Sequence, residues 1–222
     1  MVKIARYTIL DNFYFDVVKA ISDELNTNGI PYIVVGGTAY QMKLAELVSN
    51  EKNLDSNEYV LGAFLRKTGD IDLSVRGDLI QIVQLFNVMA ATTPSFTIQN
   101  LPNKSLRIER NSESIQVSYQ TESADLRGLH DFYDNIIDTA DDVVLWKGNR
   151  VIRTHIPHLD YLLASKLIRM KEKDKVDISN LLNAYKNKGE NITSELESTR
   201  RILKFLGKEN KFDYISTTAY GY

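Results

Sequence analysis

The sequence predicts an α/β domain whose mixed sheet is flanked by helices, followed by a helical C-terminal part. Three observations support this fold class. A short β-branched run at 32–35 lies between two segments whose apolar residues have helical spacing. Residues 96–121 have the composition and turn signals of consecutive strands. Residues 157–206 return to a helical pattern, without an internal repeat or a low-complexity linker.

Length and composition limit the possible classes of protein. The 222 residues suit one domain, or one domain with a sizeable appendage, and are enough to bury a real core. With 43% hydrophobic and 25% charged residues, the composition is that of an ordinary globular protein. There is no cysteine, which excludes disulfides, thiolate metal sites and a cysteine nucleophile, and which fits the cytoplasmic location that we expect. Apolar runs stay well short of the roughly 18 residues of a membrane helix, so we expect no membrane partner. The net charge of −2 gives no overall basic surface for nucleic acid.

The first half of the chain alternates between helix and strand. Helical spacing predicts a helix from Asn12 to Asn28, which the sequence NTNGIP ends. Tyr32 to Val35 reads as a short buried strand, and we expect Thr38 to cap the helix that follows it. The polar sequence SNEKNLDSNE interrupts that helix, and YVLGAFLRKT predicts a second helical segment. DIDLSV then alternates with period two, typical of a strand, and Asp78 is placed to cap the next helix.

The second half is predicted to form strands and then helices. FTIQNL, SLRIER and SIQVSYQT are separated by PNK and NSE, a pattern typical of antiparallel hairpins. DVVLWKGNRVIRTHI predicts one more hairpin around Lys147 to Asn149. The segments HLDYLLASKLIRMKEK, KVDISNLLNAYKNKG and ITSELESTRRILKFLG are helical in pattern, with KEKDK as a solvated helix end. The tail KENKFDYISTTAYGY has no period, and we assign it no structure.

The predicted strand DIDLSV carries two aspartates that could form a metal site. Asp70 and Asp72 are two residues apart, so their carboxylates project from one face of the strand. Two anions at roughly 4 Å repel by about 4 kcal/mol at an effective dielectric near 20, and such a pair tends to collect a cation. Oxygen ligands of this kind favour Mg²⁺ or Mn²⁺. An exposed edge strand that merely happens to carry two aspartates is the alternative.

Gly36 and Gly37 follow the strand at 32–35 and, taken alone, indicate only a tight strand-to-helix turn. The order of strand, Gly-Gly, helix N-terminus and a strand with Asp-x-Asp resembles the nucleotidyltransferase superfamily that shares the DNA polymerase β fold. The resemblance implies that Gly36, Gly37 and Thr38 cradle the phosphates of a nucleotide at the helix N-terminus. It also implies catalytic and metal-binding roles for Asp70 and Asp72.

The pattern further resembles the AbiEii-like and related minimal nucleotidyltransferases, over roughly residues 33–182. Their motifs correspond here to GGTA from Gly36, to RKTGDIDL from Arg66, and to LLASKLIRMKEKDKVDISNLL from Leu162. We accordingly expect a nucleotidyltransferase-like domain over residues 1–155, with residues 156–222 completing its cleft.

The resemblance implies further site residues. Lys166 would neutralise phosphate charge at the active site, and Asp177 would orient Lys166 or a second substrate. From the residues alone, Lys166 lies in an apolar helical stripe, where a lysine either extends to water or meets an anion. A structural ion pair between Lys166 and Asp177 is the alternative. Arg66, four residues before Asp70, could reach a carboxylate or a phosphate.

The sequence departs from the superfamily where a third carboxylate is expected. The strand SIQVSYQT should carry it, but its alternating polar positions are Gln116, Ser118 and Gln120. Nearby acids are Glu109, Glu122 and Asp125, and the sequence does not choose among them. A second departure is the long stretch from residue 41 to residue 65, which could form a flap over the acceptor.

Two functions therefore compete. The first is a metal-dependent nucleotidyltransferase that moves an NMP from an NTP to an acceptor hydroxyl on an RNA end such as tRNA, on a protein or on a small molecule. The family suggests the toxin of a toxin–antitoxin or phage-defence pair as its setting, with an antitoxin protein as partner. The alternative is a catalytically degenerate protein of the same fold that binds nucleotide or a protein partner, which the missing third acid favours.

Overall fold

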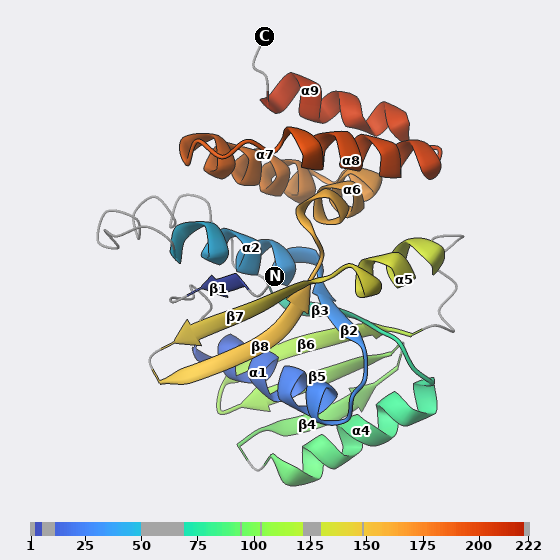
Figure 1. The fold of residues 1–222 in the computed structure, drawn as a ribbon. Helices are drawn as coiled ribbons and strands as arrows, with labels where there is room; N and C mark the ends of the chain where they lie inside the picture. Colours follow the sequence, from blue (N-terminus) through green and yellow to red (C-terminus); the bar gives the residue numbers. More distant parts are fainter. Residues whose placement is uncertain are drawn as a thin grey trace.

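The structure is a computed structural model that describes residues 3–5, 12–49, 69–93, 95–102, 104–121, 130–147 and 149–219. Its elements in chain order are β1 (Lys3–Ala5), α1 (Asn12–Thr27), β2 (Tyr32–Val35), α2 (Gly36–Ser49), β3 (Asp70–Val75), α4 (Leu79–Thr92), β4 (Thr97–Leu101), β5 (Ser105–Arg110), β6 (Glu113–Gln120), α5 (His130–Asp138), β7 (Asp141–Lys147), β8 (Arg150–Ile156), α6 (Leu159–Arg169), α7 (Glu172–Asn187), α8 (Thr193–Phe205), the 3₁₀ helix η1 (Glu209–Phe212) and α9 (Asp213–Ala219) (Figure 1). This confirms the predicted α/β class with a helical C-terminal part.

The main sheet has five strands in the order β2-β3-β6-β5-β4. Only the central pair β3–β6 is parallel, and the remaining pairs are antiparallel, so the sheet is mixed. The run β4-β5-β6 forms the two consecutive hairpins that the turn signals predicted. A second sheet, β1-β7-β8, contains the hairpin predicted near residue 148, with β1 added parallel to β7.

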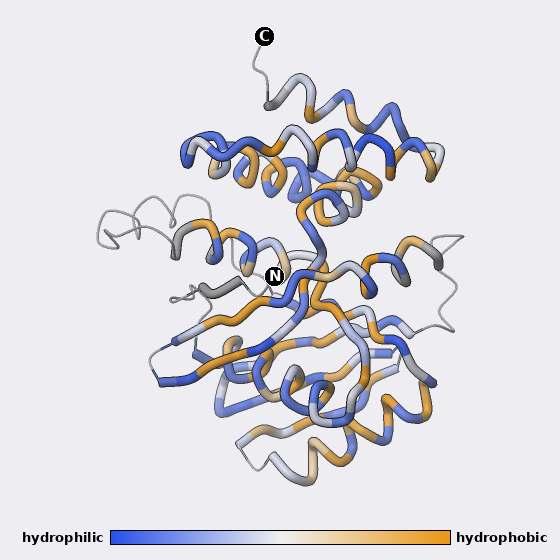
Figure 2. The backbone as a smooth tube through the Cα atoms, viewed as in Figure 1, coloured by the Kyte–Doolittle hydropathy of each residue, from blue (hydrophilic) through white to orange (hydrophobic). Residues whose placement is uncertain are grey.

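Helix α2 lies between the sheets and the C-terminal helices. Figure 1 shows helices α6 to α9 gathered at one end of the molecule, with α2 beneath them. Helix α2 contacts β2 and β3 on one side and α6 and α7 on the other. Figure 2 shows apolar residues concentrated along the strands and recurring along the helices. Buried apolar side chains from both parts, such as Ile33, Leu73, Leu163 and Leu181, belong to one continuous core.

The cap predicted at Thr38 is wrong. Helix α2 begins at Gly36, so Thr38 lies within its first turn, and the Thr38 side chain is fully buried. The turn is made instead by the backbone of Gly36, whose φ of +67° is easily adopted only by glycine. The predicted cap at Asp78 is confirmed, because its Oδ1 accepts a hydrogen bond of 2.7 Å from the amide of Ile80.

The boundary between the first two C-terminal helices also differs from the expectation. Helix α6 ends at Arg169, because Met170 adopts the left-handed conformation with a φ of 52°. The residues KEKDK therefore belong to the start of α7 rather than to a solvated end of α6, and one of them, Asp174, is fully buried. The unassigned tail folds as η1 and α9. The predicted helical segment YVLGAFLRKT lies outside the described residues, as does the stretch at 50–65.

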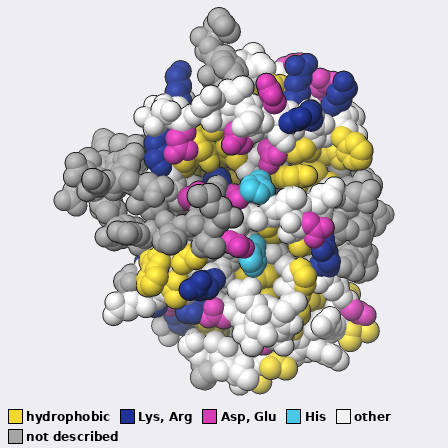
Figure 3. Space-filling model, in the orientation of Figure 1, with side chains coloured by type: hydrophobic (Ala, Val, Ile, Leu, Met, Phe, Trp, Pro, Cys, Tyr) yellow, Lys and Arg dark blue, Asp and Glu magenta, His cyan; other side chains and the backbone are white. Residues whose placement is uncertain are grey.

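The distribution of charged side chains on the surface is consistent with the small net charge of the chain. On the face shown in Figure 3, basic and acidic side chains are interspersed over the described surface. In the part of the chain that the structure describes, every helix is too short or too polar to cross a membrane.

Candidate functional site

Strand β3 places both aspartates beside the polar positions of β6. Asp70 is in register with Gln116, and Asp72 is in register with Ser118 on the parallel neighbour. The alternate residues of β3 are apolar and buried, whereas Asp70 is exposed and Asp72 is half-buried. The two carboxylates therefore project from one face of the sheet, as their spacing predicted.

Gly36 lies directly against the carboxylate of Asp72. A β-carbon placed on Gly36 would be 2.5 Å from Oδ2 of Asp72 and 3.3 Å from its Cγ, closer than real β-carbons approach other atoms. The positive φ favours glycine at this position, and a β-carbon here would force the carboxylate of Asp72 to move. The N-terminus of α2, with Gly37 as its second residue, begins beside the aspartate pair.

Tyr14 of α1 links the start of α2 to β3. Its hydroxyl donates to the backbone carbonyl of Asp70 at 2.8 Å and is hydrogen-bonded to the hydroxyl of Thr38. The Thr38 hydroxyl oxygen also lies 3.3 Å from the Asp70 carbonyl oxygen, so these three oxygens share the protons of the two hydroxyls. The Thr38 side chain is therefore engaged in tying α2 to β3. Sequence reasoning did not find Tyr14, whose only signal is a tyrosine among the buried residues of α1.

A cavity of about 160 Å³ opens where these elements meet the helical part. Its lining residues are Val35, Gly36, Asp72, Gln120, Ile136, Pro157, Ser165 and Arg169. Arg169 was not identified from the sequence, where its one signal is that it lies about one helical turn after Lys166. The structure thus brings Gly36, Asp72 and a basic side chain of α6 to one cavity.

The charge environment of Asp72 favours a cation. Burial, and secondarily the neighbouring Asp70, raise the pKa of Asp72 above its ordinary value. The positive charges of Arg169, Lys173 and Lys166 oppose this shift in the pKa without cancelling it. An ionised Asp72 is therefore held at a cost that a bound cation would relieve.

The donor set fits one particular class of metal site. Among the described residues there is no group of three or more His, Asp or Glu side chains arranged to hold a metal. Two carboxylates on one strand face are nevertheless enough for Mg²⁺, which usually keeps waters and takes further oxygens from a phosphate substrate.

Lys166 and Asp177 form a buried ion pair. The Nζ of Lys166 lies 2.5 Å from Oδ2 of Asp177, and each side chain is 1% exposed. The same Nζ lies 3.8 Å from Oδ1 of Asp174 and 5.2 Å from the ring centroid of Tyr40 in α2. Burial lowers the pKa of Lys166, and the Asp177 carboxylate acts in the opposite direction. This is the ion pair that sequence reasoning offered as the alternative, while a catalytic role for either residue stays a prediction.

The described residues that line this cavity do not include the remaining sequence-predicted acids or Arg66. Three lie outside the described part of the chain: Arg66, Glu122 and Asp125. Glu109 lies on β5, two strands from β3, in register with Ser114. The β6 position beside Asp72 is occupied by Ser118.

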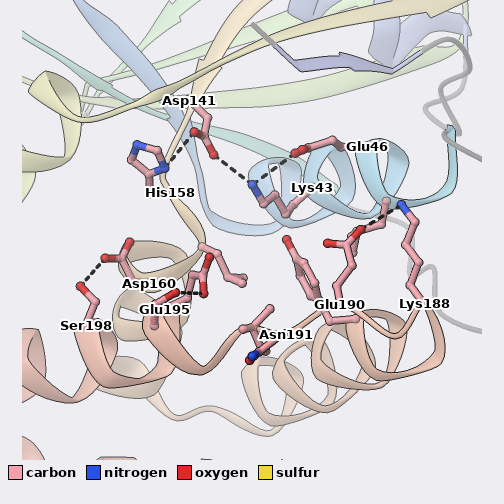
Figure 4. A pocket seen from close by; sticks show the side chains of 15 residues that line it. Lys43, Glu46, Asp141, His158, Asp160, Lys188, Glu190, Asn191, Glu195 and Ser198 are labelled. Carbon is pink, nitrogen blue, oxygen red and sulfur yellow. Dashed lines mark hydrogen bonds and ion pairs between the residues drawn. The ribbon is translucent and has the colours of Figure 1, made fainter. Parts of the chain in front are cut away.

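A second cavity, of about 410 Å³, lies between α2, the start of α6 and the α7–α8 connection (Figure 4). The buried Nζ of Lys43 pairs with Asp141 at 2.9 Å and with Glu46 at 3.2 Å. His158 Nδ1 lies 2.8 Å from the same Asp141. Because these side chains pair with one another, we interpret this cavity as part of the polar contact between the sheet and the helical part.

Comparisons with known proteins give distant structural similarities. No family model matches the chain, and no curated protein matches it. A solution structure of the antibiotic-resistance factor ANT(2'')-Ia is 15% identical over 94% of this chain and 92% of that one, with a TM-score of 0.41. A crystal structure of ANT(2'')-Ia in complex with adenylyl-2''-tobramycin is 12% identical over 92% of this chain and 95% of that one, with a TM-score of 0.37. At these values the similarity assigns neither substrate nor reaction.

Proposed function

We propose that this protein is a metal-dependent nucleotidyltransferase, which moves an NMP from an NTP to an acceptor hydroxyl. The contact between Gly36 and Asp72 carries this proposal. It places a helix N-terminus, which attracts anions, directly beside a pair of carboxylates, which attracts a divalent cation. A nucleoside triphosphate with its metal ion is a ligand that presents both charges together.

Each residue of the junction then has a role. Asp70 and Asp72 would hold Mg²⁺ or Mn²⁺, and the bound ion would neutralise charge on the phosphates. The backbone at Gly36 and Gly37 would approach the phosphates, since neither residue has a side chain to prevent it. Thr38 would contribute its backbone only, because its hydroxyl is engaged with Tyr14 and with the Asp70 carbonyl.

The proposed reaction is an in-line displacement. The acceptor oxygen forms a bond to the α-phosphorus, the bond from that phosphorus to the β-bridging oxygen breaks, pyrophosphate leaves, and the hydroxyl proton passes to water. Catalysis would come mainly from positioning and charge neutralisation. An RNA end, a protein hydroxyl and a small molecule are the acceptor classes, and the setting as the toxin of a toxin–antitoxin pair rests on the sequence resemblance.

One observation favours a second candidate. Ser118 stands in register beside Asp72, where the superfamily pattern leads us to expect a third carboxylate. A serine cannot accept a proton or balance metal charge as a carboxylate does. A protein of this fold that binds nucleotide or a protein partner without turnover is therefore the alternative function.

A transfer assay separates the two. The protein is incubated with each α-labelled NTP, Mg²⁺ and in turn total RNA, carrier protein and an aminoglycoside. We expect label on one acceptor class, with loss of transfer in Asp72→Asn but not in Asp142→Asn, which removes an exposed aspartate of β7. Nucleotide binding without transfer to any of these acceptors would favour the alternative.

A further inference from the structure

The basic side chain that lines the Asp72 cavity belongs to the last turn of α6. Arg169 lines this cavity together with Gly36 and Asp72. Its side chain is 39% exposed, so a ligand in the cavity can reach the guanidinium. Arg169 is the last residue of α6, because the left-handed Met170 ends the helix immediately afterwards.

A buried carboxylate orients this arginine. The Nη2 of Arg169 donates to Oδ1 of Asp174 at 2.5 Å, and Asp174 is fully buried at the start of α7. The other oxygen of Asp174 accepts from the backbone amide of Lys171 at 3.2 Å. A guanidinium carries five N–H donors in a rigid plane, so it can bind Asp174 on one edge and a phosphate on another.

Unlike Arg169, Lys166 is fully buried, and it is paired within the protein. Its Nζ is paired with Asp177 at 2.5 Å, both side chains are 1% exposed, and the ring of Tyr40 lies next to it. To reach a phosphate, Lys166 would have to leave Asp177 buried without its cation. The pair instead joins α6 to α7 and, through Tyr40, to α2.

We propose that Arg169, positioned by Asp174, is the side chain that binds the phosphate chain of the nucleotide, and that it makes the site selective for triphosphates over monophosphates. Lys166 and Asp177 then hold the helix that carries Arg169. The inference rests on the proposed function, because it places the phosphates in the cavity between Gly36 and Asp72. Arginine suits this role, since its planar fork matches the oxygens of a phosphate.

The test is calorimetric binding of ATP, GTP, CTP and UTP, and of the four corresponding monophosphates, in Mg²⁺. Arg169→Gln should lower the affinity for the best-bound triphosphate by roughly tenfold or more. It should lower the affinity for the corresponding monophosphate by less than about threefold, because only the longer phosphate chain contacts the guanidinium. Arg169→Lys should retain part of the triphosphate affinity. Arg200→Gln, which removes an exposed arginine of α8 that pairs with Glu209 of η1, should bind as the wild type does.

The ratio of triphosphate to monophosphate affinity keeps the test independent of folding, because a general loss of structure would weaken both ligands alike. Unchanged triphosphate affinity in Arg169→Gln, or equal losses for both ligands, would overturn the role of Arg169 while the wild type still binds nucleotide. Absence of nucleotide binding by the wild type would instead contradict the proposed function.

Discussion

The carboxylate oxygen Oδ2 of Asp72 occupies the space in which any residue other than glycine at position 36 would place its β-carbon, 2.5 Å from that atom. The strand bearing the aspartates and the start of α2 are therefore fitted to each other at atomic contact. The glycine permits the turn and leaves the carboxylate of Asp72 in its observed position.

Gly36→Ala should destabilise the protein and impair nucleotide binding. A left-handed non-glycine residue costs about 1–2 kcal/mol, and the contact with Asp72 adds to this by displacing its carboxylate. Gly29→Ala is the matched control, because Gly29 has a φ of +61° but nothing within 4 Å of its β-carbon position. Urea unfolding of both variants should show the larger loss for Gly36→Ala. Equal losses would mean that the Asp72 contact imposes no constraint.

Tyr14→Phe should loosen the attachment of α2 to β3. It removes one hydroxyl that is bonded to both Thr38 and the Asp70 carbonyl, and a buried hydrogen bond of this kind contributes about 1 kcal/mol. A double-mutant cycle with Thr38→Val, followed by urea unfolding, measures the coupling. We expect the two losses to be non-additive, since the groups share a network. Additive losses would show that the hydroxyls act independently.

Asp72→Asn should stabilise the metal-free protein at neutral pH. The pKa of Asp72 is raised in the folded state, chiefly by burial. The protonated side chain therefore contributes to the stability of the fold, and this contribution is fully present below the ordinary aspartate pKa. That contribution is lost as the pH rises through the higher folded pKa. The variant's gain in melting temperature should therefore be seen at pH 7 and should disappear in acid. Asp142→Asn controls for the loss of an exposed charge, and a gain at pH 7 that persists unchanged in acid would refute this reading.

Lys166→Met should be strongly destabilising, because it leaves Asp177 buried without its cation, at a cost of about 3–5 kcal/mol. The double variant Lys166→Met with Asp177→Leu should recover most of that loss by replacing the pair with apolar packing. Lys175→Met breaks an exposed pair with Glu172 and should change the stability little, because water screens such a pair. Thermal unfolding of these three variants measures the losses of stability. A small loss in the single variant Lys166→Met would contradict a structural role for the Lys166–Asp177 pair.

The structural features that the sequence predicted correctly depend on local pattern. The period-two alternation of DIDLSV correctly placed Asp70 and Asp72 on one face of a strand, and the turn signals located the hairpins of the main sheet. The N-terminus of α2 was misplaced, since the positive φ of Gly36 begins the helix before any capping side chain is needed.

The remaining site features depend on tertiary contacts that no local pattern encodes. Tyr14 reaches Asp70 from a helix 56 residues away in the chain, and its sequence signal is that of an ordinary core tyrosine. Arg169 lines the cavity as the last residue of α6, and the helical pattern running through KEK concealed the end of that helix at the left-handed Met170. The position of the aspartates was therefore predictable, and the identity of the basic residue beside them was not.

The most direct test of the central claim is a calorimetric titration of each NTP into the wild type and into Asp72→Asn, in Mg²⁺ and in chelator. If Asp70 and Asp72 hold the metal of a triphosphate beside Gly36, binding should require Mg²⁺ and should weaken by roughly tenfold or more in the variant. Equal affinity in Mg²⁺ and in chelator, unchanged in Asp72→Asn, would contradict the claim and would indicate a site that recognises the base or the ribose.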